Sequence, residues 1–167
     1  MPCVVADTSP LFYLAKLGRF ALLRELYGRV HIPPEVWRET LAGGQVEPAL
    51  APLFLKAESD GWLVITPVTA LSPEPRVRGL DAGEQEAIAL AKHLGAKLII
   101  DEKRGRTVAA QLGLTVTGTL GVLVDAKLNG LIPTLAPELS KLRRETGFRF
   151  SEKLAQLALR RAGEAPE

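Results

Sequence analysis

The sequence has little cysteine, few aromatic residues and no long hydrophobic run, and each shortage excludes a class of protein. Its 167 residues include a single cysteine, Cys3, so no disulfide can form within the chain. No apolar run reaches the roughly 18 residues that a membrane helix needs, and the first residues lack the basic and apolar regions of a secretory signal. We therefore expect a soluble, cytoplasmic protein that makes no contact with a membrane.

An excess of charge of either sign is also missing. The chain has 21 Lys and Arg against 19 Asp and Glu, a formal net charge of +2, and 47% of its residues are hydrophobic. This balance excludes wholesale disorder, and it lacks the basic excess that by itself would indicate nucleic-acid binding. The length fits one globular domain over residues 1–167, large enough to fold without a structural metal.

Short apolar runs alternate with helical segments along the whole chain. The runs have little internal alternation of polar and apolar residues, which indicates strands buried on both faces of a sheet. Residues expected in strands are 4–6, 29–32, 62–65, 97–100 and 114–116. Helices between strands of this kind predict an α/β fold, namely a three-layer α/β/α sandwich with a parallel sheet of about five strands.

Two acidic residues directly follow expected strands. Asp7 comes after the run Val4–Ala6, and Asp101 comes after the run Lys97–Ile100. Ligands of parallel sheets bind beyond the carboxyl ends of the strands, close to the point where the strand order reverses. We therefore expect Asp7 and Asp101 to lie side by side if their strands are neighbours.

Two further acids fall on the inner faces of expected helices. Glu39 follows Val36 by three residues, and Glu84 precedes Ala87 by three. Four carboxylates at one sheet edge repel one another and raise each other's pKa values, unless a cation neutralises them. Hard divalent ions such as Mg²⁺ or Mn²⁺ prefer oxygen ligands of this kind. The four acids therefore predict a divalent-metal site.

Each acid taken alone also has a purely structural interpretation. Asp7 fits the position of a cap on the helix that follows it, and Asp101 fits an ordinary strand exit. Asp81 and Glu84 have the D-x-x-E spacing of a capping box. Glu39 has no obvious partner, which is typical of a solvated helix residue. The prediction of a metal site depends on the four acids together.

The order of several sequence blocks adds a resemblance to a known family. The blocks are VVADTSPLFYLAKLG, IPPEVWRETL, GEQEAI, LIIDEKRGR and TGTLGVL. In this order and spacing they resemble the PIN domain superfamily over residues 3–160. The resemblance is closest to an uncharacterised PIN-like group related to the VapC toxins of toxin–antitoxin systems.

The resemblance implies specific roles. It assigns metal binding and catalysis to Asp7, Glu39, Glu84 and Asp101, with Mg²⁺ or Mn²⁺ as the cofactor. Glu84 stands where many PIN nucleases carry Asp, and the extra methylene alters the reach of that ligand. Thr8 and Ser9 match polar positions beside the first acid, where a hydroxyl holds a carboxylate or a water molecule. The implied activity is hydrolysis of RNA phosphodiester bonds by water, and a toxin paired with an antitoxin protein is one role it allows.

Three cations follow Asp101 in the sequence. Lys103, Arg104 and Arg106 are placed to hold phosphates of an RNA substrate, although a solvated helix start has the same composition. Other chemistries lack their motifs, because the chain has no glycine-rich nucleotide loop and no D-x-D at its first acid. The alternative function is an inactive PIN-like module that binds RNA or a partner protein.

The family resemblance also implies a homodimer. The expected helices between residues 11 and 27 carry apolar side chains that we assign to the contact between the two copies. These side chains include Phe12, Phe20 and Leu23.

Overall fold

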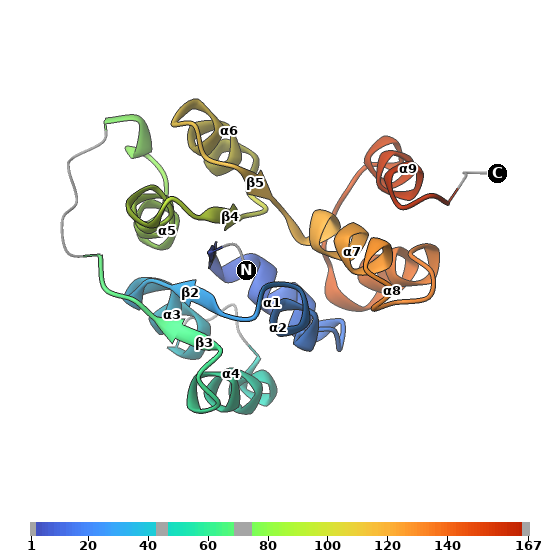
Figure 1. Cartoon of the computed structure of the whole chain (residues 1–167), viewed down its shortest axis with the longest axis horizontal. Helices are drawn as coiled ribbons and strands as arrows, with labels where there is room; N and C mark the ends of the chain where they lie inside the picture. The colour runs from blue at the N-terminus through green and yellow to red at the C-terminus, as the bar shows by residue number, and fades with distance from the viewer. Residues whose placement is uncertain (1–2, 43–46, 69–74, 165–167) are drawn as a thin grey trace.

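The protein contains one five-stranded sheet in which all the strands are parallel. The structure, a computed structural model, describes residues 3–42, 47–68 and 75–164. The strands are β1 (Val4–Ala6), β2 (Val30–Ile32), β3 (Leu63–Ile65), β4 (Lys97–Ile99) and β5 (Val116–Thr117). Their order across the sheet is β3-β2-β1-β4-β5 (Figure 1). Successive strands are added on one side of β1 up to β3 and on its other side from β4, so the strand order reverses between β1 and β4. This confirms the predicted α/β class.

Burial on both faces explains why these short segments form a parallel sheet. All three residues of β1 are inaccessible to solvent, as are Leu98 and Ile99 of β4. β-Branched and aliphatic side chains without polar alternation are stable only where helices cover both faces. β1 pairs with β4 over its whole length, Val4 opposite Lys97 and Ala6 opposite Ile99. The pair of strands β1 and β4 therefore forms the buried middle of the sheet.

Helices connect the strands and follow the last one. They are α1 (Thr8–Lys16), α2 (Ala21–Tyr27), α3 (Pro34–Ala42), α4 (Ala51–Ser59), α5 (Ala82–Leu94), α6 (Lys103–Gln111), α7 (Thr119–Leu128), α8 (Ala136–Thr146) and α9 (Glu152–Arg161). Two short 3₁₀ helices, η1 (Pro48–Leu50) and η2 (Pro75–Val77), complete the described part. Within that part, no helix is both long and apolar enough to cross a membrane.

The helices form layers on the two sides of the sheet. α5 packs on β1 and β4 with α6 beside it, while α1, α2 and α7 pack together on the opposite side (Figure 1). α3 contacts both α1 and α5, and it therefore lies where the two layers meet. α8 packs on α1 and α9 on α7, so the C-terminal helices extend the second layer beyond β5. This is the predicted three-layer sandwich.

All five predicted strands form, although the last lies at Val116–Thr117 instead of residues 114–116, and two further predictions need correction. The proline-rich composition of residues 72–79 favours a loop, but residues 75–77 form η2, and residues 72–74 lie outside the described part. The expected dimer surface is wrong for Phe20 and Leu23, which are 7% and 0% exposed. Phe20 packs against Phe54 and Trp62, with ring centroids 5.1 Å from each. These side chains belong to the core, and the homodimer itself stays a prediction.

One ion pair joins the first helices to the C-terminal ones. Arg19, between α1 and α2, donates to both carboxylate oxygens of Glu138 on α8, with N–O distances of 3.1 and 2.5 Å. Glu138 is only 8% exposed. Its charge therefore depends on the guanidinium for compensation.

We expect Arg19→Ala to lower the free energy of unfolding by about 1–3 kcal/mol, because it leaves a buried carboxylate without its partner. Urea denaturation measures the change. Arg38→Ala is the matched control, since it breaks an exposed pair with Glu35 within one helix and should leave stability nearly unchanged. Equal stability of the Arg19 variant and wild type would contradict a stabilising role for this pair.

Candidate active site

The strand order brings Asp7 and Asp101 to the same edge of the sheet. Asp7 directly follows β1, Asp101 follows β4 after one intervening residue, Ile100, and these two strands are neighbours. The backbone N–H of Asp7 donates to the carbonyl oxygen of Ile99 at 2.9 Å, which extends the pairing to the end of the strands. Asp7 is 5% exposed. The two acids therefore lie at the topological switch point, where ligands of such folds bind.

Thr119 fixes the carboxylate of Asp101. The backbone N–H of Thr119 donates to Oδ1 and its hydroxyl donates to Oδ2, both at 2.7 Å. Thr119 is fully buried at the first turn of α7, so it is a rigid donor. A Cβ at Gly118 would lie 2.7 Å from Asp101 Oδ1, and only glycine leaves room for the carboxylate there. Gly118 and Thr119 of the sequence block TGT thus hold the Asp101 carboxylate in place.

Glu39 reaches the same edge from α3. The hydroxyl of Thr8 donates to Glu39 Oε2 at 2.8 Å. A Cβ at Gly83 on α5 would stand 2.6 Å from Glu39 Oε1, so the carboxylate packs directly on that helix. The Thr8 hydroxyl therefore holds a carboxylate, which is one of the two roles predicted for it.

Glu84 and Asp81 occupy the first turn of α5. Asp81 is the N-cap, and its Oδ1 accepts the backbone N–H of Glu84 at 2.8 Å. The capping interpretation of Asp81 is therefore correct. Glu84 is nonetheless buried, at 8% exposed. A Cβ at Gly105 of α6 would lie 3.3 Å from Glu84 Oε2, which shows how closely α6 approaches it. Asp81 therefore caps α5 while Glu84, in the same helical turn, lies buried with the other acids.

Electrostatics show which carboxyls face one another. Burial raises the pKa of Asp7 to about 7, and the charges of Asp81, Glu39 and Asp101 raise it as well, against a lowering by the Thr8 N–H. Burial also raises the pKa of Glu84 to about 8, with further contributions from Asp81 and Asp7.

Asp101 also has a raised pKa through burial, although Thr119 and the nearby Arg106 guanidinium oppose the rise. We call the five residues that interact in this way the acidic centre: Asp7, Glu39, Asp81, Glu84 and Asp101.

The donor atoms of the acidic centre fit a hard divalent cation. They are all carboxylate oxygens, and burial raises the pKa values of Asp7, Glu84 and Asp101, as expected of acids taken from water without a neutralising charge. As they lie, no three His, Cys, Asp or Glu side chains within residues 3–42, 47–68 and 75–164 form a ready-made metal site. Metal binding would therefore require the carboxylates to move toward one another.

The predicted substrate-binding residues are divided among different places. Arg104 contacts the segment before α5, where its Nη2 donates to the carbonyl of Arg78 at 3.3 Å. Lys103 is exposed at the start of α6, and Ser9 is half-buried in α1. Arg106 alone of the three cations acts on Asp101.

Asp81 is the functional candidate that sequence reasoning placed only as a cap. Among the other acids, its charge has the largest effect on Asp7. The D-x-x-E spacing could have indicated that Asp81 belongs to the site. An N-cap residue and the acid three residues later both lie at the N-terminal end of the helix. Both side chains of a capping box at the switch point therefore belong to the site.

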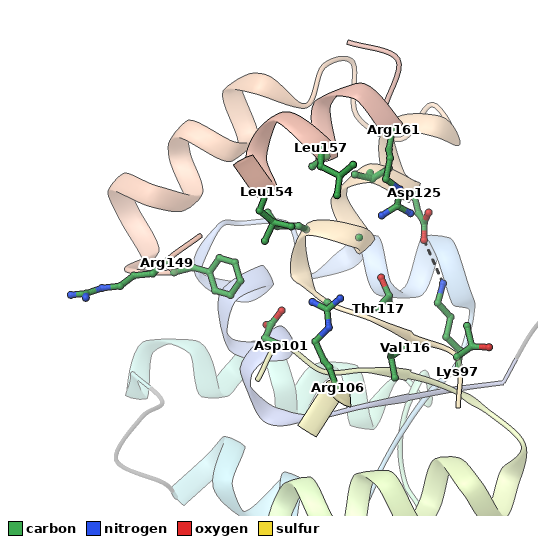
Figure 2. A pocket seen from close by; sticks show the side chains of 17 residues that line it. Lys97, Asp101, Arg106, Val116, Thr117, Asp125, Arg149, Leu154, Leu157 and Arg161 are labelled. Atoms are coloured by element: carbon green, nitrogen blue, oxygen red, sulfur yellow. Dashed lines mark ion pairs between the residues drawn. The ribbon is translucent and has the colours of Figure 1, made fainter. Parts of the chain in front are cut away.

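A groove opens beside Asp101. It has a volume of about 400 Å³ and runs along β5 between α7 and α9. Figure 2 shows Arg106 pointing into it from one side and Leu154 and Leu157 from the other. Asp101 thus lines both the acidic centre and the groove.

The raised pKa values predict how stability depends on pH. Since Asp7 titrates near 7 and Glu84 near 8 in the folded chain, against 3.8 and 4.5 ordinarily, the folded state retains protons that the unfolded state has lost. The free energy of unfolding of the metal-free protein should therefore fall as pH rises from about 4 to about 8. At about 1.4 kcal/mol per pKa unit, Asp7 accounts for at most about 4 kcal/mol.

Urea denaturation in EDTA at several pH values measures this slope. Asp7→Asn removes one of the titrating groups, so its stability should fall less steeply and exceed that of wild type at pH 8. Parallel curves for the two proteins would show that Asp7 ionises normally in the folded chain.

Comparison with known proteins agrees with this geometry. A family model described as a PIN domain, DUF3368, matches residues 3–164. No curated protein matches the chain. PIN domains are generally nucleases and typically use divalent metals, which fits the acids at the switch point. With nearly its whole length matched, the chain belongs to the PIN domain superfamily.

Proposed function

We propose that the protein is a divalent-metal-dependent ribonuclease that hydrolyses RNA phosphodiester bonds with water. The observation that carries the proposal is the pair Asp7 and Asp101 beyond the ends of β1 and β4, with Glu39 and Glu84 at the same edge. Burying neighbouring carboxylates costs free energy, and a bound cation would compensate for that cost. Membership of the PIN domain superfamily supports the same chemistry.

Each residue of the acidic centre has a role in this proposal. Asp7, Glu39, Glu84 and Asp101 would hold Mg²⁺ or Mn²⁺, and Asp81 adds negative charge beside Asp7. The bound ion would polarise a phosphoryl oxygen and lower the pKa of a water molecule. Thr119 orients Asp101 and Thr8 orients Glu39 through the hydrogen bonds described above. Because these two carboxylates are already oriented, their side chains lose less conformational entropy when the ion binds.

The biological setting stays a set of predictions from the sequence. A toxin role with an antitoxin partner, a cytoplasmic location and a homodimer are compatible with the proposed ribonuclease. The hydrolytic chemistry requires none of them. A binding module without activity is the alternative that the next experiment separates.

We expect Asp7→Asn to abolish Mn²⁺-dependent cleavage of single-stranded RNA, by about 100-fold or more, because the change removes a ligand charge while keeping the side-chain volume. Metal affinity, measured by calorimetry, should fall with it. The stability of the metal-free fold should not fall, since the substitution relieves repulsion.

Asp60→Asn is the matched control, because Asp60 is an acid at the far end of α4 and pairs with Lys56. It should cleave like wild type. If Asp7→Asn cleaves RNA as fast as wild type, the hydrolytic proposal is wrong and the binding module takes its place.

A second variant tests the position of Glu39. In Gly83→Ala the new methyl group would displace the Glu39 carboxylate, which stands 2.6 Å from the Cβ position. We expect metal affinity to fall about 10- to 100-fold, as for a misplaced ligand, while the fold remains stable because a flexible side chain gives way. Glu39→Gln should give a loss of similar size. Unchanged Mn²⁺ binding in both variants would remove Glu39 from the site.

A further inference from the structure

The groove beside Asp101 has a mixed apolar and cationic lining. β5 and Arg106 form one side, and α9 forms the other (Figure 2). We call it the α9 groove. β5 is an edge strand of the sheet, so the groove lies where no further strand covers the sheet.

Helix α9 presents its leucines to the groove rather than to the core. Leu154 and Leu157 are 40% and 46% exposed, whereas Ala155 and Ala158 are buried where α9 packs on α7. The spacing of Leu154, Leu157 and Arg161 places all three on one face of the helix, and all three line the groove. Two large apolar side chains are thus left open to solvent beside a charged end.

The cations of the groove differ in whether they are already neutralised. Lys97 forms an ion pair with Asp125 at 3.6 Å. Arg106 and Arg161 make no ion pair within the described part of the chain, and Arg149 directs its guanidinium away from the cavity (Figure 2). The Arg161 guanidinium is therefore available to an anionic ligand, and that of Arg106 lies close enough to Asp101 to lower the pKa of that carboxyl.

Arg106 also connects the groove to the acidic centre. A Cβ at Gly118 would lie 3.3 Å from Arg106 Nη1 and 2.7 Å from Asp101 Oδ1, so both groups flank the same glycine. A phosphate held by Arg106 would stand directly beside the proposed metal ligands. The groove is the continuation of the site along the sheet edge.

We propose that the α9 groove receives the RNA strand on one side of the scissile phosphate, as an unpaired strand. Arg106 and Arg161 bind successive stretches of the phosphate backbone, and a nucleobase packs against Leu154 and Leu157. This inference rests on the proposed ribonuclease function, and it assigns the path of the strand to the groove that α9 forms with β5. A base can reach the apolar wall only when it is unpaired and unstacked.

Binding of a fluorescein-labelled single-stranded RNA octamer, measured by fluorescence anisotropy in EDTA at 50 mM salt, tests the proposal. Arg161→Ala should weaken binding about fivefold to tenfold and reduce the salt slope by roughly 0.7, the contribution of one phosphate contact on a single strand. Leu157→Glu should weaken it at least about tenfold, through loss of the base contact and added repulsion. A blunt duplex of the same sequence should bind more weakly than the octamer and respond less to Leu157→Glu.

Two neighbouring residues on α9 supply matched controls outside the groove lining. Arg160→Ala removes the same charge, and Gln156→Glu adds the same charge, each one residue from its counterpart. Equal RNA affinity in Arg161→Ala and Arg160→Ala would overturn the inference, as would equal affinity in Leu157→Glu and Gln156→Glu. An extended peptide as the true occupant would give that same result.

The cleavage assay with Asp7→Asn separates the two failures. If wild type cleaves RNA, Asp7→Asn does not, and the α9 variants bind normally, the groove inference alone is wrong. If the wild-type protein neither binds nor cleaves RNA, both proposals fail together. Weakened binding only in the groove variants supports the inference whichever way cleavage turns out.

Discussion

The burial of neighbouring carboxyls at one edge of the sheet is the constraint on which the rest of this structure depends. Asp7 lies at the end of a strand with no solvent-accessible residue, and three other acids raise its pKa. Removing a carboxylate from water costs several kcal/mol unless hydrogen bonds or a counter-charge compensate. Hydrogen-bond donors at the same edge of the sheet compensate for part of this free-energy cost. A bound divalent cation would compensate for the rest.

The partial compensation comes from hydroxyl donors and from the absence of side chains. Thr119 and Thr8 each satisfy one carboxylate oxygen with their hydroxyl, so two of the acids are oriented before any ligand arrives. Gly83 and Gly118 allow helix and loop backbone to approach the acids more closely than any other residue would. These four positions explain why the TS, GE and TGT segments matter to the site as much as the acids do.

The sequence allowed the fold and the central pair of acids to be predicted, because both follow from local patterns. Apolar runs that end in Asp7 and Asp101 fix the strands, and the parallel order places their ends together. Asp81 was recognised only as a cap, since its distance from Asp7 depends on how α5 crosses the sheet. Phe20 and Leu23 were assigned to a surface because helical periodicity shows which residues share a face. It does not show that a second layer, here Phe54 and Trp62, covers that face.

The C-terminal helices add a groove beside the acids to the general fold, and we propose this groove as the substrate path. The acids and the hydroxyls that hold them come from the ends of β1 and β4 and from α1, α3, α5 and α7, whereas α9 lines the same groove as Asp101 and Arg106. The small residues Ala155 and Ala158 let α9 pack closely on α7, and this contact turns the neighbouring leucines toward β5. Had those alanines been larger, α9 would stand farther from the sheet and the groove would widen into open surface. The packing of α9 on α7 therefore helps to set the width of the groove that α9 forms with β5.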